Sequence, residues 1–280
     1  MTRMDQPAPL PGHQTRDVAH HSEGTETHLR DALAEEIPVA MVYNGISHAV
    51  MLATPTSLEA FGLGFSLSEG ILTSHSELYD IEAVEQRDGI ELRMEISAQK
   101  FADLKQKRRS MTGRTGCGLC GAESLEQAVR HPGKVQSTFS IAANALHLAM
   151  SDIGRHQVLQ SLTGAAHAAA WVSSAGDILF LEEDVGRHNA LDKLIGRLAM
   201  RDTDFSQGLA LLTSRASYEM VQKAATVGIP MLAAVSAPTA LAVDMAEETG
   251  ITLLGFVRKG NHVIYSNPQR LALSKTEPAP

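Results

Sequence analysis

Between residues 37 and 97, apolar and polar positions follow the pattern of two strand pairs separated by one helix. Each pair consists of two apolar runs joined by a turn dipeptide, Asn44-Gly45 in the first pair and Asp88-Gly89 in the second. Such a dipeptide between two apolar runs predicts a β-hairpin. The intervening segment 54–70 is typical of a helix, with serine or threonine as a cap near its start and Gly70 at its end.

From about residue 140 the pattern changes to apolar, strand-like runs that alternate with segments of helical periodicity. The helical segments are 141–164, 186–200, 216–228 and 238–250. The strand-like runs are 167–174, 177–184, 208–214, 230–236 and 251–257. Alternation of this kind predicts a sheet that helices cover and that has at least one parallel portion.

These patterns divide the chain into three parts. Residues 1–36 lack apolar periodicity and are rich in proline, histidine, threonine and acidic residues, so we predict a disordered tail with solvated histidines. Residues 37–139 form a smaller, β-rich N-terminal subdomain, and residues 140–280 form a C-terminal α/β subdomain. The predicted fold class is therefore α/β, with a mixed sheet flanked by helices.

Composition narrows the class of protein. At 280 residues, with 44% hydrophobic and 20% charged residues, the chain suits a soluble globular protein of one large or two modest domains. No apolar run is long enough to cross a bilayer, and the N-terminus lacks the apolar stretch of a secretory signal. We therefore expect no membrane contact and a cytoplasmic location. In that reducing compartment, a Cys-x-x-Cys pair indicates a reactive or metal-binding site more strongly than a structural disulfide.

The net charge of −8 argues against a nucleic-acid-binding protein and is unevenly distributed. Residues 1–36 hold three arginines against seven acidic residues, half of the net charge. Residues 104–122 have no acid and five basic residues, which are Lys105, Lys107, Arg108, Arg109 and Arg114. We expect a basic loop that either steers an acidic partner or an anionic ligand toward the neighbouring cysteines or is simply solvated.

Four turns at the predicted carboxyl ends of strands are polar, and these are residues 182–189, 213–217, 235–239 and 255–261. In open α/β sheets, ligands bind at this edge, where strands are followed by helices. Three of the turns contain arginine, and a helix N-terminus beside Arg or Ser is a natural phosphate site. The sequence therefore predicts an anion-binding rim, although Arg187 taken alone is expected in a surface salt bridge.

The only two cysteines, Cys117 and Cys120, lie in the stretch RTGCGLCGAES, where glycines flank both of them. Glycines leave the loop thin, so that a large partner can approach the sulfur atoms. A helix predicted over 122–131 would place its N-terminal dipole, together with Arg114, near the thiols and favour the thiolate form. We therefore expect a nucleophilic sulfur and not a buried, inert cysteine.

Three chemistries compete for this cysteine pair. A structural zinc site needs two further ligands, and the chain has no second cysteine pair. A thioredoxin-like redox pair directly follows a strand, whereas this pair follows a long basic loop. Zinc deamination uses His-x-Glu followed by Pro-Cys-x-x-Cys. His75-Ser76-Glu77 has the right order, but Thr115-Gly116 replaces the proline, and we expect His75 to be a plain surface residue.

Six motifs in order resemble those of the FdhD family: TGCGLCG, TGAAHAAAW, EDVGRHNALDKLIG, SRASYEMVQKA, AVSAPTALAV and GFVRKGN. The resemblance runs from about Pro38 to Arg270. It implies an accessory sulfurtransferase for formate dehydrogenases, which accepts sulfur from a cysteine desulfurase as a persulfide. The sulfur then passes to the bis-molybdopterin guanine dinucleotide molybdenum cofactor. The resemblance also implies a cytidine-deaminase-like α/β fold and a homodimer, so the partners are the desulfurase, the formate dehydrogenase catalytic subunit and a second copy.

The resemblance also assigns roles to residues by position. Cys117 matches the persulfide-bearing cysteine and Cys120 its companion, so both are candidate catalytic residues. The stretch matched to cofactor binding is Phe256, Val257, Arg258, Lys259, Gly260 and Asn261. Contacts to phosphates and guanines are expected from Arg187, His188, Asn189, Ser214, Arg215 and Ser236.

Some assignments stay open at this point. His167 is either a core histidine or a ligand contact. No residue is assigned as a metal ligand. The alternatives to a sulfur carrier are a cofactor chaperone that performs no chemistry and, more remotely, a zinc hydrolase.

Overall fold

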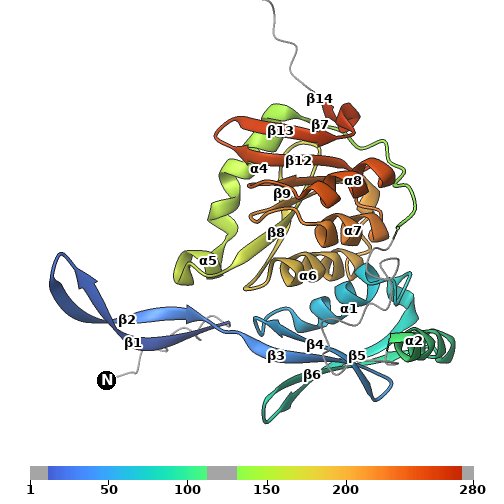
Figure 1. Ribbon diagram of the computed structural model, residues 1–280, viewed down its shortest axis with the longest axis horizontal. Helices are drawn as coiled ribbons and strands as arrows, with labels where there is room; N and C mark the ends of the chain where they lie inside the picture. The colour runs from blue at the N-terminus through green and yellow to red at the C-terminus, as the bar shows by residue number, and fades with distance from the viewer. Residues whose placement is uncertain (1–11, 112–130, 273–280) are drawn as a thin grey trace, which may run out of the picture.

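A four-stranded and a six-stranded sheet with their helices make up most of the molecule, and the computed structural model describes residues 12–111 and 131–272 of the chain (Figure 1). The first sheet, in the order β4-β3-β6-β5, consists of β3 (Ile37–Tyr43), β4 (Ile46–Ala53), β5 (Leu78–Gln86) and β6 (Gly89–Ile96). The pairs β3–β4 and β5–β6 are antiparallel, and β3 lies parallel to β6. Both predicted hairpins are therefore confirmed.

The turn of the first hairpin follows from its two residues. Asn44 and Gly45 have φ angles of 45° and 79°, which suit a two-residue hairpin turn. The Asn44 side chain also donates to the carbonyl of Ile96 and accepts from its amide, both at 2.9 Å, and so ties the turn to β6.

Helix α1 (Leu58–Ser68) follows β4 as predicted, but its N-terminus has no side-chain cap. Ser57, the expected cap, has a φ of 50°, and its hydroxyl donates to Glu182 at 2.7 Å. A tertiary contact therefore replaces the local capping bond that the sequence pattern favours.

The second sheet has six strands in the order β13-β12-β11-β10-β8-β9. They are β8 (His167–Val172), β9 (Ile178–Asp184), β10 (Leu209–Leu212), β11 (Met231–Ala234), β12 (Thr252–Arg258) and β13 (Asn261–Ser266). β10, β11 and β12 are parallel, whereas β8, β9 and β13 pair antiparallel with their neighbours. The sheet is mixed, as predicted.

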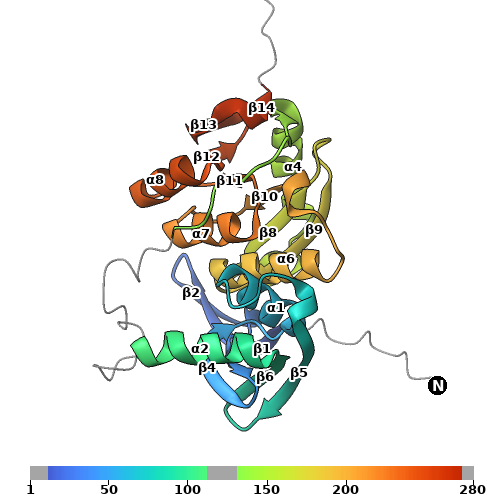
Figure 2. The same cartoon turned by 90° about the vertical axis from the view of Figure 1, so that its right-hand side faces the viewer.

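Helices cover both faces of this sheet (Figures 1 and 2). One face packs against α6 (Arg187–Ala199), α7 (Tyr218–Val227) and α8 (Ala240–Thr249), and the other against α4 (Ala143–His156), which α5 (Val158–Thr163) follows. In β8, Ala169 and Trp171 face the α6 side, while Ala170 and Val172 face the α4 side. Burial on both faces explains why these strands are apolar without alternation.

The two parts of the chain share one interior. Helix α1 packs along α6, and a single apolar cluster runs from β3 and β6 through these helices to α7. The α/β fold class is confirmed. No helix in the described ranges is long and apolar enough to cross a membrane.

The prediction of a disordered tail is wrong for residues 13–34. They form an antiparallel hairpin of β1 (His13–Ser22) and β2 (Thr25–Ala34), which projects from the body (Figure 1). Its side chains are almost all exposed, so it lacks the apolar periodicity on which the prediction depended. The turn uses Glu23 and Gly24, with φ angles of 50° and 81°.

The expected basic loop is partly helical. Helix α2 (Ala98–Met111) includes the start of the basic run, because lysine and arginine favour helices and the side chain of Lys105 lies over the Phe101 ring. The helix predicted over 122–131 lies outside the described residues, apart from its last position. Short elements that were not predicted are β7 (Ile141–Ala142), β14 (Leu271–Ala272), η1 (His75–Glu77), η2 (Phe205–Gln207) and η3 (Pro268–Arg270).

Candidate functional site

The four predicted polar turns lie at one edge of the six-stranded sheet. β10, β11 and β12 are parallel, so their carboxyl ends share that edge. β8 runs antiparallel to β10, which places its first residue, His167, at the same edge. β9 ends there too, because Asp184 pairs with His167. We call His167 and the turns that follow β9, β10, β11 and β12 the rim.

Arg187, the first residue of α6, has unused hydrogen-bonding capacity at the rim. Its Nε atom is buried without a hydrogen-bond partner, and within the described ranges its guanidinium forms no ion pair. The predicted surface salt bridge is therefore wrong, because the neighbouring acid, Glu219, pairs with His188 instead. A guanidinium in this state is free to bind an anion.

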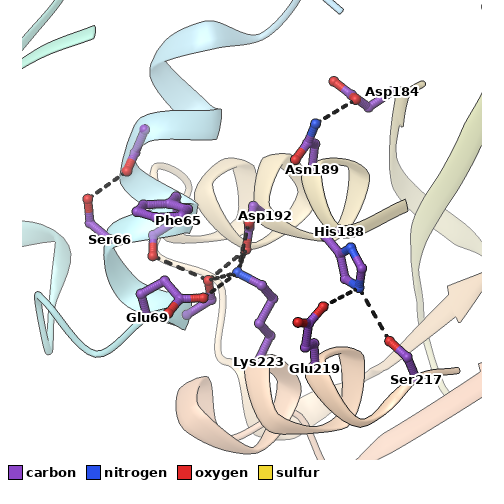
Figure 3. Close-up of polar contacts among 12 residues, drawn as sticks. Phe65, Ser66, Glu69, Asp184, His188, Asn189, Asp192, Ser217, Glu219 and Lys223 are labelled. Carbon is purple, nitrogen blue, oxygen red and sulfur yellow. Dashed lines mark hydrogen bonds and ion pairs between the residues drawn. The ribbon is translucent and has the colours of Figure 1, made fainter. Parts of the chain in front are cut away.

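His188 lies between two polar groups of the next helix. Its Nε2 atom is 2.8 Å from Glu219 Oε2 and 3.3 Å from Ser217 Oγ (Figure 3). The hydrogen bond from His188 lowers the pKa of Glu219. In a nucleophilic triad, serine and acid bind opposite ring nitrogens, so this arrangement does not activate Ser217. Instead, its contacts with Glu219 and Ser217 fix the His188 ring as a polar group at the rim.

Asn189 has a structural role that its sequence position did not indicate. It is only 3% exposed, and its amide nitrogen donates to the carbonyl of Leu52 at 2.7 Å and to Asp184 at 2.9 Å. Asp184 also accepts from the amides of Thr54 and Gly186 and pairs with Lys193 at 2.7 Å. Because both amide hydrogens of Asn189 are used internally, the geometry does not support its predicted ligand contact.

The turns after β10 and β11 supply fewer free groups than expected. Ser214 is buried, and its hydroxyl donates to the carbonyl of Arg215 at 3.0 Å. The side chain of Arg215 is exposed. Ser236 is half-buried, and its carbonyl accepts from the amide of Phe256 at 3.3 Å, which joins this turn to β12. The Arg215 side chain is thus accessible to a ligand, whereas Ser236 joins two turns through its main-chain carbonyl.

The stretch 256–261 forms the end of β12, a tight turn and the start of β13. Phe256 has a φ of 52° within an irregular section of the strand pair, an unusual backbone conformation for a bulky residue. Val257 is fully buried in the core, whereas Arg258 lies with its guanidinium 5.7 Å from the centre of the Phe256 ring. Lys259 and the neighbouring glycine make the turn at φ angles of 50° and 75°.

The six residues that were predicted to bind the cofactor therefore have different roles in this turn. Arg258, Lys259 and Gly260 are exposed at its tip, while Val257 anchors it. Asn261 donates to the carbonyl of Lys259 at 3.0 Å and stiffens the turn. Together with Arg187 and Arg215, the two tip cations form no salt bridge in the part of the chain that the structure describes. The rim is therefore positively charged and attracts anions.

A buried charge cluster behind the rim was not predicted. Lys223 of α7 lies 2.9 Å from Asp192 of α6 and 2.9 Å from Glu69, and Ser68 donates to Asp192 at 2.6 Å (Figure 3). Burial raises the pKa of Asp192 against the opposing effect of Lys223. Burial acts to lower the pKa of Lys223, but the two carboxylates hold it above its ordinary value. The cluster joins α1, α6 and α7 through charge as well as apolar contact.

Two further predictions concern the cysteines and the His-x-Glu sequence. Cys117 and Cys120 lie outside the described residues. His75 is exposed, as expected of a surface residue. The carboxylate of Glu77 accepts from the amide of Thr73 at 2.6 Å and pairs with Lys100 at 3.2 Å.

Comparisons with known proteins agree with this architecture. The sequence model of the FdhD/NarQ family matches residues 34–272. A sulfur carrier protein FdhD from Cupriavidus necator is 56% identical over 93% of this chain and 91% of its own length. One from Xanthomonas euvesicatoria is 49% identical over 94% of both chains.

A solved structure supports the fold independently. It is the crystal structure of a candidate formate dehydrogenase accessory protein from Desulfotalea psychrophila, with 20% identity and a TM-score of 0.73. The match covers 94% of this chain and all of the other. By the extent of the family match and the identity of its relatives, the chain belongs to the FdhD/NarQ family.

Proposed function

We propose that this protein is a sulfur carrier for the maturation of formate dehydrogenase. In this proposal it accepts sulfur from a cysteine desulfurase as a persulfide on Cys117. It then passes the sulfur to the bis-molybdopterin guanine dinucleotide molybdenum cofactor, which is its substrate. The observation that carries the proposal is the relative named a sulfur carrier protein, 56% identical over 93% of the chain.

The cysteines supply the chemistry of the proposed first step. The Cys117 thiolate attacks the outer sulfur of the desulfurase persulfide, the sulfur–sulfur bond of the donor breaks, and the desulfurase cysteine leaves as a thiolate. This first step is an exchange without net oxidation or reduction, so it requires no further oxidant or reductant. The flanking glycines give a bulky donor access, and Cys120 either resolves or shields the new persulfide.

The rim supplies binding groups for the nucleotide ends of the substrate. Those ends carry diphosphates, and a guanidinium binds phosphate oxygens in a two-pronged way that lysine cannot reproduce. Arg187, Arg215, Arg258 and Lys259 form no close ion pair within residues 12–111 and 131–272, although the charge of Arg187 acts on Glu219 from a greater distance. These charges fit an anionic substrate, with His188 as a polar neighbour.

A cofactor chaperone without sulfur chemistry is the second candidate, because the cationic rim would serve it equally well. The discriminating experiment is formate dehydrogenase maturation in cells that lack the native protein. The carrier proposal predicts no maturation with Cys117→Ser, since serine cannot hold a persulfide, provided that the variant is folded and abundant. Full maturation by Cys117→Ser would favour the chaperone, and Cys120→Ser in parallel would define the role of the second cysteine.

The proposal includes a cytoplasmic location and a homodimer. Sedimentation of the purified protein tests the second point directly. A monomer at micromolar concentration would contradict the proposed homodimer but would not affect the proposed sulfur chemistry.

A further inference from the structure

The tip of the β1–β2 hairpin carries three potential metal ligands on one face, and we propose that they bind a divalent transition-metal cation such as Zn²⁺. His21 of β1 lies directly opposite Glu26 of β2, in the second residue pair from the turn. His28 follows Glu26 by two positions on the same strand, so all three side chains project from one face of the hairpin. Two imidazoles and a carboxylate are a ligand set that suits zinc in a site with one open position.

The distances within this cluster suit a single metal ion. Oε2 of Glu26 is 3.5 Å from Nδ1 of His21, and Oε1 of the same carboxylate is 3.6 Å from Nε2 of His28. In a tetrahedral zinc site, bonds of about 2.0–2.2 Å place neighbouring ligand atoms about 3.3–3.6 Å apart. The carboxylate therefore stands between the two rings at the separation that shared coordination requires.

The two rings must turn toward the carboxylate to close the site. His21 and His28 are diagonal neighbours across the hairpin, and no three His, Cys, Asp or Glu side chains in the described ranges already meet at one metal position. Diagonal neighbours on a strand pair are within reach of long side chains. The exposed fractions of the His21, Glu26 and His28 side chains are 68%, 54% and 78%, so the rings are free to rotate. The site therefore assembles when the cation binds.

A bound cation would stabilise an element that has no core of its own. Almost all side chains of β1 and β2 are exposed, and the tip of the hairpin projects from the body (Figure 1). A two-stranded hairpin without a buried apolar face is at best marginally stable in water. In structural metal sites the binding free energy contributes directly to folding. A cation that is bound by both strands would therefore hold the tip together.

The test is isothermal titration calorimetry of the untagged full chain with zinc chloride. Cys117→Ser/Cys120→Ser is the background in every sample, because thiolates also bind zinc. We expect one Zn²⁺ per chain. Loss of a group that only orients a metal ligand costs about 10–100-fold in affinity, so His21→Gln and His28→Gln should each weaken binding by about a hundredfold or more. His20→Gln is the matched control, because His20 lies on the same strand but projects from the opposite face.

Imidazole NMR signals of the same background protein locate the cation. On addition of Zn²⁺ the signals of His21 and His28 should shift, whereas those of His20 should stay in place. Three results would overturn the site: no zinc binding to the cysteine-free background, undiminished affinity in His21→Gln and His28→Gln, or an equal loss of affinity in His20→Gln.

Limited digestion with trypsin tests the stabilising role of the cation. Arg16 and Arg30 are exposed cleavage sites within the two strands of the hairpin. Zn²⁺ should slow cleavage after both residues in the cysteine-free background, but not when His28→Gln is added. Equal slowing with and without His28→Gln would contradict a cation bound at the hairpin.

Discussion

Gly64 in α1 lies directly against the main-chain carbonyl of Asp192 in α6, so closely that a β carbon at Gly64 would overlap that oxygen. The reverse contact is equally close, because a β carbon at Gly196 of α6 would overlap the carbonyl of Ala60 in α1. The two helices therefore meet backbone to backbone. This contact joins the first sheet to the helix that begins at the rim.

We predict that Gly64→Ala and Gly196→Ala each destabilise the protein by about 3 kcal/mol or more, since neither backbone can move aside without displacing the helix. Gly154→Ala is the matched control. Gly154 is exposed within α4 and has free space around it, so alanine should stabilise by about 0.5–1 kcal/mol. Urea unfolding measures all three, and a loss below about 1 kcal/mol at both interface glycines would refute the close contact.

Lys193 and Asp184 are fully buried, 2.7 Å apart. Lys193→Met should cost about 3–5 kcal/mol, because it leaves the carboxylate buried without its cation. The control is Arg93→Met, which breaks the exposed pair with Glu91 and should cost less than about 1 kcal/mol. If denaturant unfolding gives equal losses of unfolding free energy for Lys193→Met and Arg93→Met, the buried pair does not contribute more to stability than the exposed pair.

Apart from α2 and the two-residue strand β7, the order of the strands and α-helices from β3 to β12 was predictable, because apolar runs mark the strands, helical periodicity marks the helices, and turns or glycines separate them. β1 and β2 were not, since an exposed hairpin has no buried face to produce periodicity. α2 was missed for a related reason, because a run of basic residues suggests a loop even though lysine and arginine favour helices.

The rim was predictable because parallel strands bring their carboxyl ends to one edge. The functions of single side chains there depend on distant partners. Asn189 bonds to the carbonyl of Leu52, 137 positions away, which no local pattern reveals.

His262 on β13 should make stability depend on pH. Burial and the neighbouring His147, at 3.0 Å, lower the pKa of His262 below its ordinary value near 6.5. Between the folded-state pKa and about pH 6.5, the unfolded chain therefore binds more protons than the folded chain. The free energy of unfolding is highest above about pH 6.5, where His262 is neutral in both states, and it decreases as pH falls toward the folded-state pKa. In His262→Gln, the loss of stability between about pH 7.5 and pH 5.5 should be smaller than in wild type. An unchanged loss, measured by urea unfolding at both pH values, would contradict the assignment.

Arg258 should contribute directly to nucleotide binding. Loss of a charge-assisted contact of about 1.5–3 kcal/mol predicts that Arg258→Ala binds GDP about ten- to a hundredfold more weakly. Arg201→Ala serves as the control, because Arg201 is exposed just beyond the far end of α6. Calorimetric titration with GDP measures both, and equal affinity of Arg258→Ala and wild type would remove Arg258 from the site.

Intact-protein mass spectrometry detects directly whether Cys117 carries sulfur. The purified protein is incubated with a cysteine desulfurase and cysteine, and its mass is compared before and after treatment with a reductant. We expect wild type, but not folded Cys117→Ser, to gain the mass of one sulfur atom, and the reductant should remove it. A sulfur adduct that persists in Cys117→Ser, or none in wild type while the desulfurase is active, would contradict this expectation.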